Sequence, residues 1–393
     1  MLNQWGFRQV KQALQHRAEQ GRVKHTQGPV RFLPEQLRSI WLLLAPSVGD
    51  VVINVPLAQA LKYQFLHSRL TVVWGRGVDC LKTLMPWIDE TLCLDSDWFN
   101  NEKRRGEPWD SLNYWRDPQR RTLLDRKPPD LLVNANGLLE SLWLAYQIQA
   151  PFRIGTHIPC DAALPAWTGW SAPAPGVHIS DHNMAWLRAL GASVASPALP
   201  DLASFADRLP DTQALRQRVR AQRPEHDQAP LVMFNPFAAQ SSPSKRWHPD
   251  QELEFARTCA AKGWQVVLVG SPADRPLAAH WGQNPNVGVC NLIGQFSLLE
   301  LAALMRQADV YVGLDTGTTH LSAALHCPTV TLFGRLDVNY IAPRGPRVRV
   351  LKQSNACTLS QKGCCTRLQC EHRVCMQAIH PLQVVEACAA WIR

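Results

Sequence analysis

The fold is decided by residues 309–334, DVYVGLDTGTTHLSAALHCPTVTLFG. Apolar residues alternate over 310–314, which predicts a buried strand of a parallel sheet. Residues 315–318, DTGT, interrupt the alternation, and apolar residues then recur at helical spacing as far as Pro328. A β-rich run follows at 329–333. The stretch therefore predicts a strand, a tight loop, a helix and a second strand.

The loop in this stretch has the composition of an anion-binding site. The first backbone N–H groups of a helix have no partner within the helix and lie at the positive end of its dipole. Gly317 would let a phosphate approach the backbone closely. From the residues alone, Asp315 or Thr316 could equally be a helix cap, and His320 could be a packed histidine.

Strands and helices alternate through the rest of the chain. We expect the other strands at 39–45, 70–74, 91–94, 130–134, 231–235, 265–270, 287–290 and 348–351. We expect the other helices at 50–67, 78–86, 138–149, 181–190, 212–222, 250–262, 273–282, 298–307 and 381–392. Tight-hairpin signals are missing, so the pattern predicts an α/β protein with parallel, doubly wound sheets. Residues 155–180 lack periodicity and are expected to form a long substrate-facing loop.

Length and composition indicate a globular protein. The chain has 393 residues, of which 46% are hydrophobic, enough for two domains with ample cores. No apolar run approaches the roughly 18–20 residues of a membrane-spanning helix. The N-terminus lacks the apolar region of a signal peptide. We therefore expect a cytoplasmic protein.

The N-terminal segment is strongly basic. The net charge of the chain is +9, and residues 1–40 carry seven Lys and Arg against two Glu. Trp5, Phe7, Val10 and Leu14 lie at partly helical spacing in this segment. It could be a basic amphipathic helix on an anionic membrane surface, or a helix that docks on the first domain by its aromatic face. Nucleic acid is not an expected partner, because no recognised nucleic-acid motif is present.

Five of the twelve cysteines gather in one short segment, at Cys357, Cys364, Cys365, Cys370 and Cys375. In a reducing cytoplasm such clustering favours a metal over disulfides. The spacing does not match the C-x2-C pattern of zinc sites. Both a structural zinc or iron site and a set of reduced, partly buried thiols remain open.

Three stretches together resemble the lipopolysaccharide heptosyltransferase family, the inverting glycosyltransferases of family 9. That family shows D-[ST]-G, then H-L-x-A-A-L, then P-x-V-x-L-F-G, and residues 315–334 contain all three motifs in this order. Residues 39–61, SIWLLLAPSVGDVVINVPLAQAL, resemble its opening pattern of an apolar strand, S-x-G-D and a helix. Residues 235–247, NPFAAQSSPSKRW, resemble its segment with a lysine shortly before a Trp-Pro helix start. The resemblance covers about residues 38–393.

The resemblance implies a GT-B fold, in which two Rossmann-like doubly wound domains face a central cleft. Residues 1–37 would be a basic extension, 38–205 the acceptor domain, 206–229 a linker and 230–393 the nucleotide-sugar domain. The Cys-rich segment 357–375 would belong to the last domain, and the final helix would pack back on the first domain.

The resemblance also implies which residues do the chemistry. Asp50 would be the catalytic base, which takes the proton of the acceptor hydroxyl while the nucleotide leaves from the opposite face of the sugar. From the residues alone, Asp50 could instead be a helix N-cap. Lys245 would stabilise the negative charge of the leaving diphosphate, together with backbone N–H groups and a helix dipole.

The implied donor-binding residues surround Lys245 and the DTGT loop. Arg246 would contact the phosphates or be solvated, and Asp274 would hold the ribose or sit at a helix N-terminus. The set is Ser244, Arg246, Asp274, Asp315, Thr316, Gly317, Thr318 and His320. The chain departs from the family with W-H-P at 247–249 and with Arg335 where many members have proline, which leaves sugar or base specificity open.

The predicted activity is transfer of heptose from ADP-heptose to a lipopolysaccharide core or lipid A acceptor, with no cofactor required for catalysis. The expected location is the cytoplasmic side of the inner membrane, as a peripheral protein on its anionic surface. Three alternatives remain open: the same chemistry on a protein or another glycan, a non-catalytic nucleotide-sugar-binding protein, and a hydrolase or epimerase of the same fold.

Overall fold

The computed structural model describes residues 34–94, 118–136, 141, 144, 145, 147–156, 169–171, 176–189, 198–222, 228–239, 242–353, 370 and 372–392. Most of the predicted basic extension, residues 1–33, therefore lies outside the described residues. The chain divides into two compact units. The first comprises Met1–Asp79, Pro86–Ala174 and Ser180–Ser196, and the second Cys80–Met85, Pro175–Ile179 and Pro197–Arg393.

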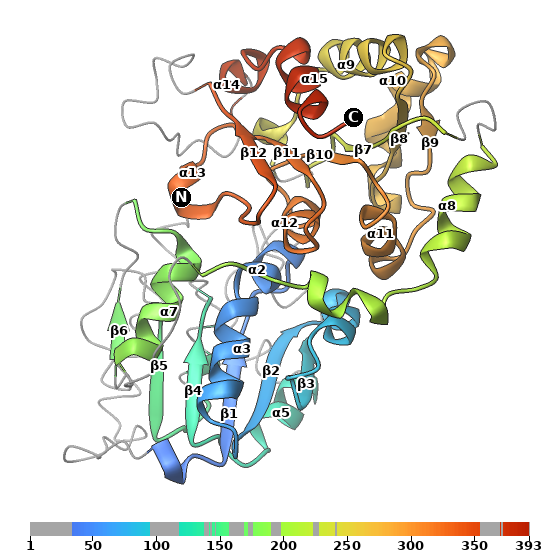
Figure 1. Ribbon diagram of the computed structural model, residues 1–393. Helices are drawn as coiled ribbons and strands as arrows, with labels where there is room; N and C mark the ends of the chain where they lie inside the picture. The colour runs from blue at the N-terminus through green and yellow to red at the C-terminus, as the bar shows by residue number, and fades with distance from the viewer. Residues whose placement is uncertain are drawn as a thin grey trace. The chain divides into compact units, whose positions relative to one another are not determined.

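The first unit contains a six-stranded parallel sheet (Figure 1). Its strands are β1 (Ser39–Leu43), β2 (Arg69–Gly75), β3 (Glu90–Leu94), β4 (Leu131–Asn134), β5 (Phe152–Thr156) and β6 (Gly169–Ser171). Their order across the sheet is β3-β2-β1-β4-β5-β6, and every neighbouring pair is parallel. This is the doubly wound order of a Rossmann fold, which requires helical crossovers on both faces.

Helices cover both faces of this sheet. The helices in this part of the chain are η1 (Pro34–Gln36) before β1, then α2 (Val48–Ile53), α3 (Val55–Gln64), η2 (Arg76–Leu84) and α5 (Pro118–Leu124) between the strands, and α7 (Ile179–Ala189) after β6, where η marks a 3-10 helix. The residues of η2 from Cys80 onward are assigned to the second unit. Trp41 and Leu43 share a buried cluster with Leu123 of α5. The alternate residues of β1, Ile40 and Leu42, point to the other face and are also fully buried.

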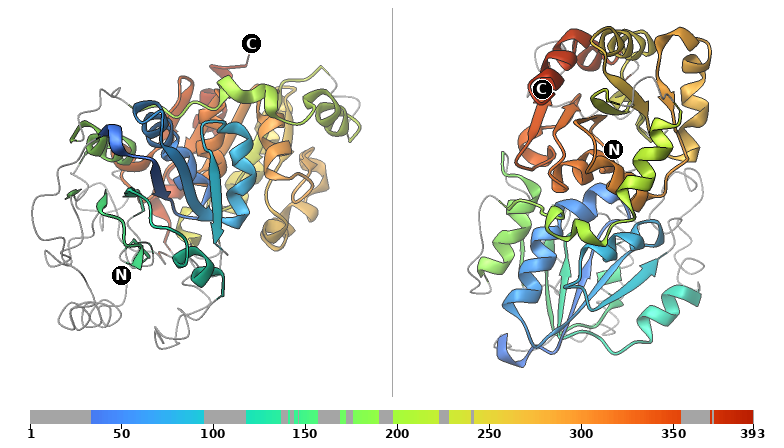
Figure 2. Two further views of the ribbon diagram at one scale, coloured as in Figure 1. Left: turned by 90° about the horizontal axis from the view of Figure 1, so that it is seen from below. Right: turned by 45° about the vertical axis from the view of Figure 1, so that its right-hand side comes forward.

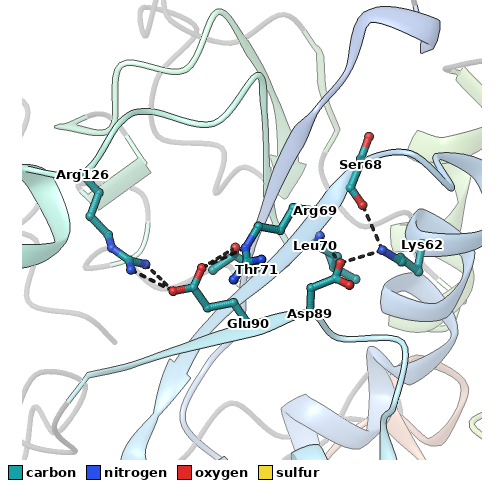
Figure 3. Close-up of polar contacts among 8 residues, drawn as sticks. All are labelled: Lys62, Ser68, Arg69, Leu70, Thr71, Asp89, Glu90 and Arg126. Atoms are coloured by element: carbon teal, nitrogen blue, oxygen red, sulfur yellow. Dashed lines mark hydrogen bonds and ion pairs between the residues drawn. The ribbon is translucent and has the colours of Figure 1, made fainter.

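Ion pairs hold the edge of this sheet where β2 and β3 begin (Figure 3). The Lys62 ammonium lies 2.7 Å from the Asp89 carboxylate, which also accepts a hydrogen bond from the Leu70 N–H at 2.7 Å. Both guanidinium Nη atoms of Arg126 donate to Glu90 Oε1 at 2.8 Å. Burial alone would raise the pKa of Glu90, but the hydrogen bonds and charges of Arg126 and Arg69 together outweigh burial and lower it. The carboxylates therefore stay ionised and tie β3 to its neighbours.

The second unit contains another six-stranded parallel sheet, in the order β12-β11-β10-β7-β8-β9. Its strands are β7 (Leu231–Asn235), β8 (Gln265–Leu268), β9 (Cys290–Asn291), β10 (Val310–Leu314), β11 (Thr329–Leu332) and β12 (Val348–Leu351). Counted from its own first strand, the sheet repeats the order of the first unit. Two doubly wound sheets confirm the predicted α/β, Rossmann-like fold.

The helices of the second unit also divide between the two sheet faces. They are α8 (Thr212–Arg220), α9 (Pro249–Ala261), α10 (Ala279–Gly282), α11 (Leu298–Met305), α12 (Gly317–Ala324), α13 (Val338–Ile341), α14 (Val374–Gln377) and α15 (Pro381–Ala389). The 3-10 helices are η4 (Ala203–Arg208), η6 (Pro243–Lys245), η7 (Pro272–Ala278) and η8 (Pro285–Val287). Phe234 and Val312 lie on the face covered by α9 and α15, in one buried cluster with Phe255 and Val384.

The final helix lies beside α9, as Figures 1 and 2 show. Its buried residues, among them Val384, Val385 and Cys388, belong to the core of the second unit. The apolar face of α15 is thus occupied within this unit, and its packing on the first domain stays a prediction. Among the described residues, no helix is both long enough and apolar enough to cross a membrane.

Four expected elements differ from the structure. The helix expected at 50–67 is split at Asn54 into α2 and α3, because Pro56 in the first turn of α3 cannot continue a helix that arrives from α2. The helix expected at 78–86 is the 3-10 helix η2. The helix expected at 273–282 begins as the 3-10 helix η7 with Pro276 inside it. The strand expected at 287–290 is β9, Cys290–Asn291.

The stretch 155–180, expected to be one long loop, contains strand residues. It holds the end of β5, all of β6 and the start of α7. These strands were missed because β6 is short and its pairing comes from β5, a neighbour in space that local periodicity does not identify.

Candidate donor-phosphate site

Polar residues converge where the order of the second sheet reverses, between β7 and β10. The strands run in register here, with Asn235 opposite Gly313. Ligands of doubly wound sheets bind beyond the carboxyl ends of the strands at this switch point. The loops after Asn235 and Leu314 therefore form the expected ligand-binding edge of this unit.

A lysine and an aspartate form a largely buried ion pair at this edge. Lys245 Nζ lies 2.7 Å from Asp315 Oδ2 and donates to the Asp315 backbone carbonyl at 2.9 Å. The Asp315 side chain is only 7% exposed and that of Lys245 21%. Burial by itself would raise the pKa of Asp315, but the neighbouring His320 imidazole and Lys245 ammonium outweigh burial and lower it. The carboxylate is therefore ionised and fixes the position of the ammonium.

The lysine is held in place by the residues that follow it. The Trp247 side chain is buried, and its indole N–H donates to the Ile379 carbonyl at 3.0 Å. His248 is the N-cap of α9 and accepts a hydrogen bond from the Asp250 N–H, while Pro249 is the first helical residue. The W-H-P departure from the family pattern is thus a histidine cap before a proline helix start.

The first turn of α12 completes this edge. Thr316 is the N-cap residue, with no side-chain capping bond, and α12 begins at Gly317. The Thr318 side chain accepts a hydrogen bond from the Asn235 amide at 3.2 Å. His320 is buried, with Nε2 3.9 Å from Asp315 Oδ1, which is beyond hydrogen-bond distance. Lys245, Asp315, Thr316, Gly317, Thr318 and His320 are thus brought together, and the arrangement can hold an anion.

The other predicted donor residues have protein partners. Ser244 is buried within η6. The Arg246 guanidinium donates to the carbonyls of Ala238 and Ala239 at 3.2 and 3.4 Å, so it closes the loop after β7. Asp274 Oδ2 accepts hydrogen bonds from the N–H and hydroxyl of Ser271, both at 2.7 Å. Donor contacts by these three residues stay predictions.

Asp50 lies in the first unit, in the first turn of α2. The N-cap of α2 is Ser47, so the alternative that Asp50 itself caps this helix is wrong. The Ser47 hydroxyl donates to the Asp50 carboxylate, and the Ser47 oxygen accepts from the Asp50 N–H at 3.2 Å. This mutual bond fixes the carboxylate at a helix N-terminus, where the ionised form is favoured. Its role as a base stays a prediction.

Comparison with family models assigns the chain to a known family. The model for glycosyltransferase family 9 (heptosyltransferase) matches residues 120–370. The chain belongs to this family.

Family 9 relatives are similar to this chain in sequence and in fold. Lipopolysaccharide heptosyltransferase 2 of Salmonella typhimurium is 31% identical over 127 residues, which cover 31% of this chain and 36% of that protein. The match thus spans about a third of the relative. A family 9 glycosyltransferase from Veillonella parvula superposes with a TM-score of 0.67 at 20% identity, over 91% of this chain and 98% of that one.

A second solved structure, E. coli ADP-heptose lps heptosyltransferase II, gives a TM-score of 0.64 at 19% identity, over 90% of this chain and 98% of that one. At such identities the likeness shows the fold, and the predicted GT-B class is confirmed.

Three members of the cysteine cluster, Cys357, Cys364 and Cys365, lie outside the described residues. Cys370 and Cys375 are half-buried. Within the part of the family 9 chain that the structure describes, no three His, Cys, Asp or Glu side chains are arranged to hold a metal ion. A structural neighbour with a TM-score of 0.53 at 16% identity, TibC from enterotoxigenic E. coli, is described as iron-containing; the superposition covers 91% of this chain and 76% of TibC.

Sequence reasoning missed two residues of this site, Asn235 and Tyr311. The Tyr311 hydroxyl donates to Thr318 Oγ1 at 2.8 Å from inside β10. The sequence signal for Tyr311 was a tyrosine within an apolar strand, VYVGL. The hydroxyl of a buried tyrosine usually has a hydrogen-bond partner.

Proposed function

We propose that this family 9 chain is an inverting glycosyltransferase that moves heptose from ADP-heptose to a lipopolysaccharide core or lipid A acceptor. The observation that carries the proposal is the Lys245–Asp315 pair beside the first turn of α12, at the switch point of the second sheet. Family membership supplies the reaction class. The similar heptosyltransferases support the sugar and the acceptor.

The leaving diphosphate would gain negative charge as the glycosidic bond breaks. The Lys245 ammonium and the first N–H groups of α12 would stabilise this charge because both are fixed before the reaction. Asp315 orients the Lys245 ammonium through the ion pair and the bond to its backbone carbonyl. These groups supply the electrostatic stabilisation from the protein itself.

Asp50 would act as the general base. Its carboxylate would accept the acceptor hydroxyl proton as that oxygen attacks the anomeric carbon. Attack from the face opposite the departing ADP inverts the configuration. Asp50 lies in the first turn of α2, and the hydrogen bond with Ser47 fixes the orientation of its carboxylate.

Turnover of ADP-heptose with a truncated core acceptor tests this proposal. ADP release is measured for the wild type, Asp50→Asn and Lys245→Met, with donor binding followed by calorimetry. The matched control is Asp250→Asn, which removes a carboxylate that is 87% exposed from the first turn of another helix. We expect Asp50→Asn to bind donor and to lose turnover by about 10²–10⁴-fold.

The outcomes separate the parts of the proposal. If Asp50→Asn keeps its turnover, the assignment of Asp50 as the general base is wrong. Donor binding without ADP release, in the wild type, contradicts the acceptor and directs the search to proteins or other glycans. If the wild-type protein does not bind ADP-heptose, the assignment of ADP-heptose as the donor is wrong.

Two further parts of the proposal concern location and structure. We infer a peripheral position on the cytoplasmic side of the inner membrane, where the basic segment 1–37 would meet anionic lipid. We also infer a structural zinc or iron site at Cys357, Cys364, Cys365, Cys370 and Cys375, which the iron-containing neighbour supports. Vesicle sedimentation with and without residues 1–33 tests the first, and metal analysis of the purified protein tests the second.

A further inference from the structure

A buried phenol lies beneath the proposed phosphate site. Tyr311 is the second residue of β10 and is fully buried. Its hydroxyl donates to Thr318 Oγ1 at 2.8 Å. Burial raises the pKa of Tyr311 to about 12, so the phenol keeps its proton and remains a donor.

A second donor reaches the same threonine. Asn235 Nδ2 donates to Thr318 Oγ1 at 3.2 Å. The orientation of this amide is fixed at its other end, because Asn235 Oδ1 accepts the Phe237 N–H at 3.2 Å. The NH2 group, and not the oxygen, therefore faces Thr318.

Two donors leave Thr318 with one remaining function. A hydroxyl has two acceptor lone pairs and a single proton. Because Tyr311 and Asn235 occupy the lone pairs, the Thr318 hydroxyl can only donate. An acceptor for this proton is Thr316 Oγ1, which lies 3.3 Å from Thr318 Oγ1.

The rest of the chain of hydroxyls has the same direction. Thr319 Oγ1 donates to the Leu314 carbonyl at 2.6 Å, so it can only accept from Thr316 Oγ1, which lies 3.3 Å away. The bonds on both sides of Thr316 are thus longer than the usual 2.7–2.8 Å of an O–H···O bond, whereas the bond from Tyr311 is of ordinary length. The long bonds are weak, and a charged acceptor can replace them.

The close approach of the Tyr311 ring and the Thr319 hydroxyl to β10 requires a glycine at position 313. A Cβ on Gly313 would lie 2.6 Å from Thr319 Oγ1 and 2.8 Å from Tyr311 Cε1. The absent side chain therefore allows the phenol and the threonine hydroxyl to approach the same strand position.

We propose that Tyr311 and Asn235 are positioning residues that hold the Thr318 hydroxyl as a donor to a phosphate oxygen of the nucleoside diphosphate. This inference rests on the proposed donor site. The Thr318 proton would leave its long bond to Thr316 and form a shorter, charge-assisted bond to the phosphate. The Thr318 hydroxyl need not reorient when the phosphate binds, because the two donors have already directed its proton away from themselves.

Calorimetric titration with ADP tests this positioning role in the full-length protein. The variants are Tyr311→Phe, Asn235→Ala and Thr318→Val, and each of the first two is also combined with Thr318→Val. We expect Thr318→Val to weaken ADP binding about tenfold, and Tyr311→Phe or Asn235→Ala about three- to fivefold. Neither should weaken binding further once Thr318 is valine, because both act through its hydroxyl.

Matched variants separate positioning from packing. Thr318→Ser keeps the hydroxyl and should keep most of the affinity. Tyr63→Phe removes an exposed phenol from the first unit and should leave ADP binding unchanged. In turnover, Tyr311→Phe should raise the KM for the donor more than it lowers kcat.

The inference is overturned if wild type binds ADP and neither Tyr311→Phe nor Asn235→Ala weakens binding. It is also overturned if the losses persist in full beside Thr318→Val, because the residues then act by packing. Absence of ADP binding in the wild type overturns the proposed donor itself, and this inference with it.

Discussion

Replacing Lys245 by methionine should destabilise the second unit strongly. The substitution keeps an unbranched apolar side chain and removes the cation that lies 2.7 Å from the Asp315 carboxylate. Removal of one partner from a buried ion pair costs about 3–5 kcal/mol, because the other charge stays buried without compensation. Lys245 is 21% exposed and His320 remains near Asp315, so we expect the lower end, about 3 kcal/mol.

Hydrogen exchange followed by mass spectrometry measures this loss where it occurs. Peptides that contain β7 and β10 should exchange roughly 150-fold faster in Lys245→Met, the factor that corresponds to about 3 kcal/mol. Peptides that contain β1 belong to the other compact unit and serve as the internal control.

The pH dependence identifies the cause. The pKa of Asp315 in the folded protein is lowered, so the pair contributes stability above the unfolded pKa of an aspartate and loses it as pH falls through the folded value. The difference between wild type and Lys245→Met should therefore be largest near pH 7 and shrink toward pH 3. Adding Asp315→Asn to Lys245→Met should restore most of the protection. A defect of equal size at both pH values, or one that Asp315→Asn does not relieve, would refute the reasoning.

Three other substitutions have defined outcomes. Gly313→Ala places a Cβ 2.6 Å from Thr319 Oγ1, so it should lower the free energy of unfolding by about 1–3 kcal/mol in urea titration and weaken ADP binding. Glu90→Gln weakens the pairing with Arg126 and should cost about 0.5–1 kcal/mol near pH 7; because the pKa of Glu90 is lowered, the cost should fade below pH 4. Trp247→Phe removes the indole N–H that bonds to a buried carbonyl, and the melting temperature should fall by an amount that corresponds to about 1–3 kcal/mol.

Local pattern was sufficient for most of the central elements. The runs at 39–45, 231–235 and 310–314 are apolar, and β1, β7 and β10 lie within them. Buried parallel strands must be apolar on both faces, so the composition of such a run reveals them directly. The short strand β6 carries no such pattern, since its pairing depends on a neighbour in the sheet.

The sequence pattern did not reveal where two of the expected helices are interrupted. Pro56 and Pro276 were visible in the sequence, but the expected helices ran through both. Pro56 ends one helix and begins another, and Pro276 lies within a 3-10 helix. Proline disfavours a continuous α-helix, and the identity of the element that replaces it depends on packing.

The sequence by itself determined the family, the alternation of strands and helices, and which residues are candidates for the donor site. The pairing of Lys245 with Asp315, 70 positions apart, and the bonds from Tyr311 and Asn235 to Thr318 were decided only by the tertiary structure. The physical reason is that periodicity records which face of an element is buried. The contacts of Lys245 and Asn235 depend instead on the strand order that brings β7 beside β10, and the contact of Tyr311 depends on how the chain turns from β10 into α12.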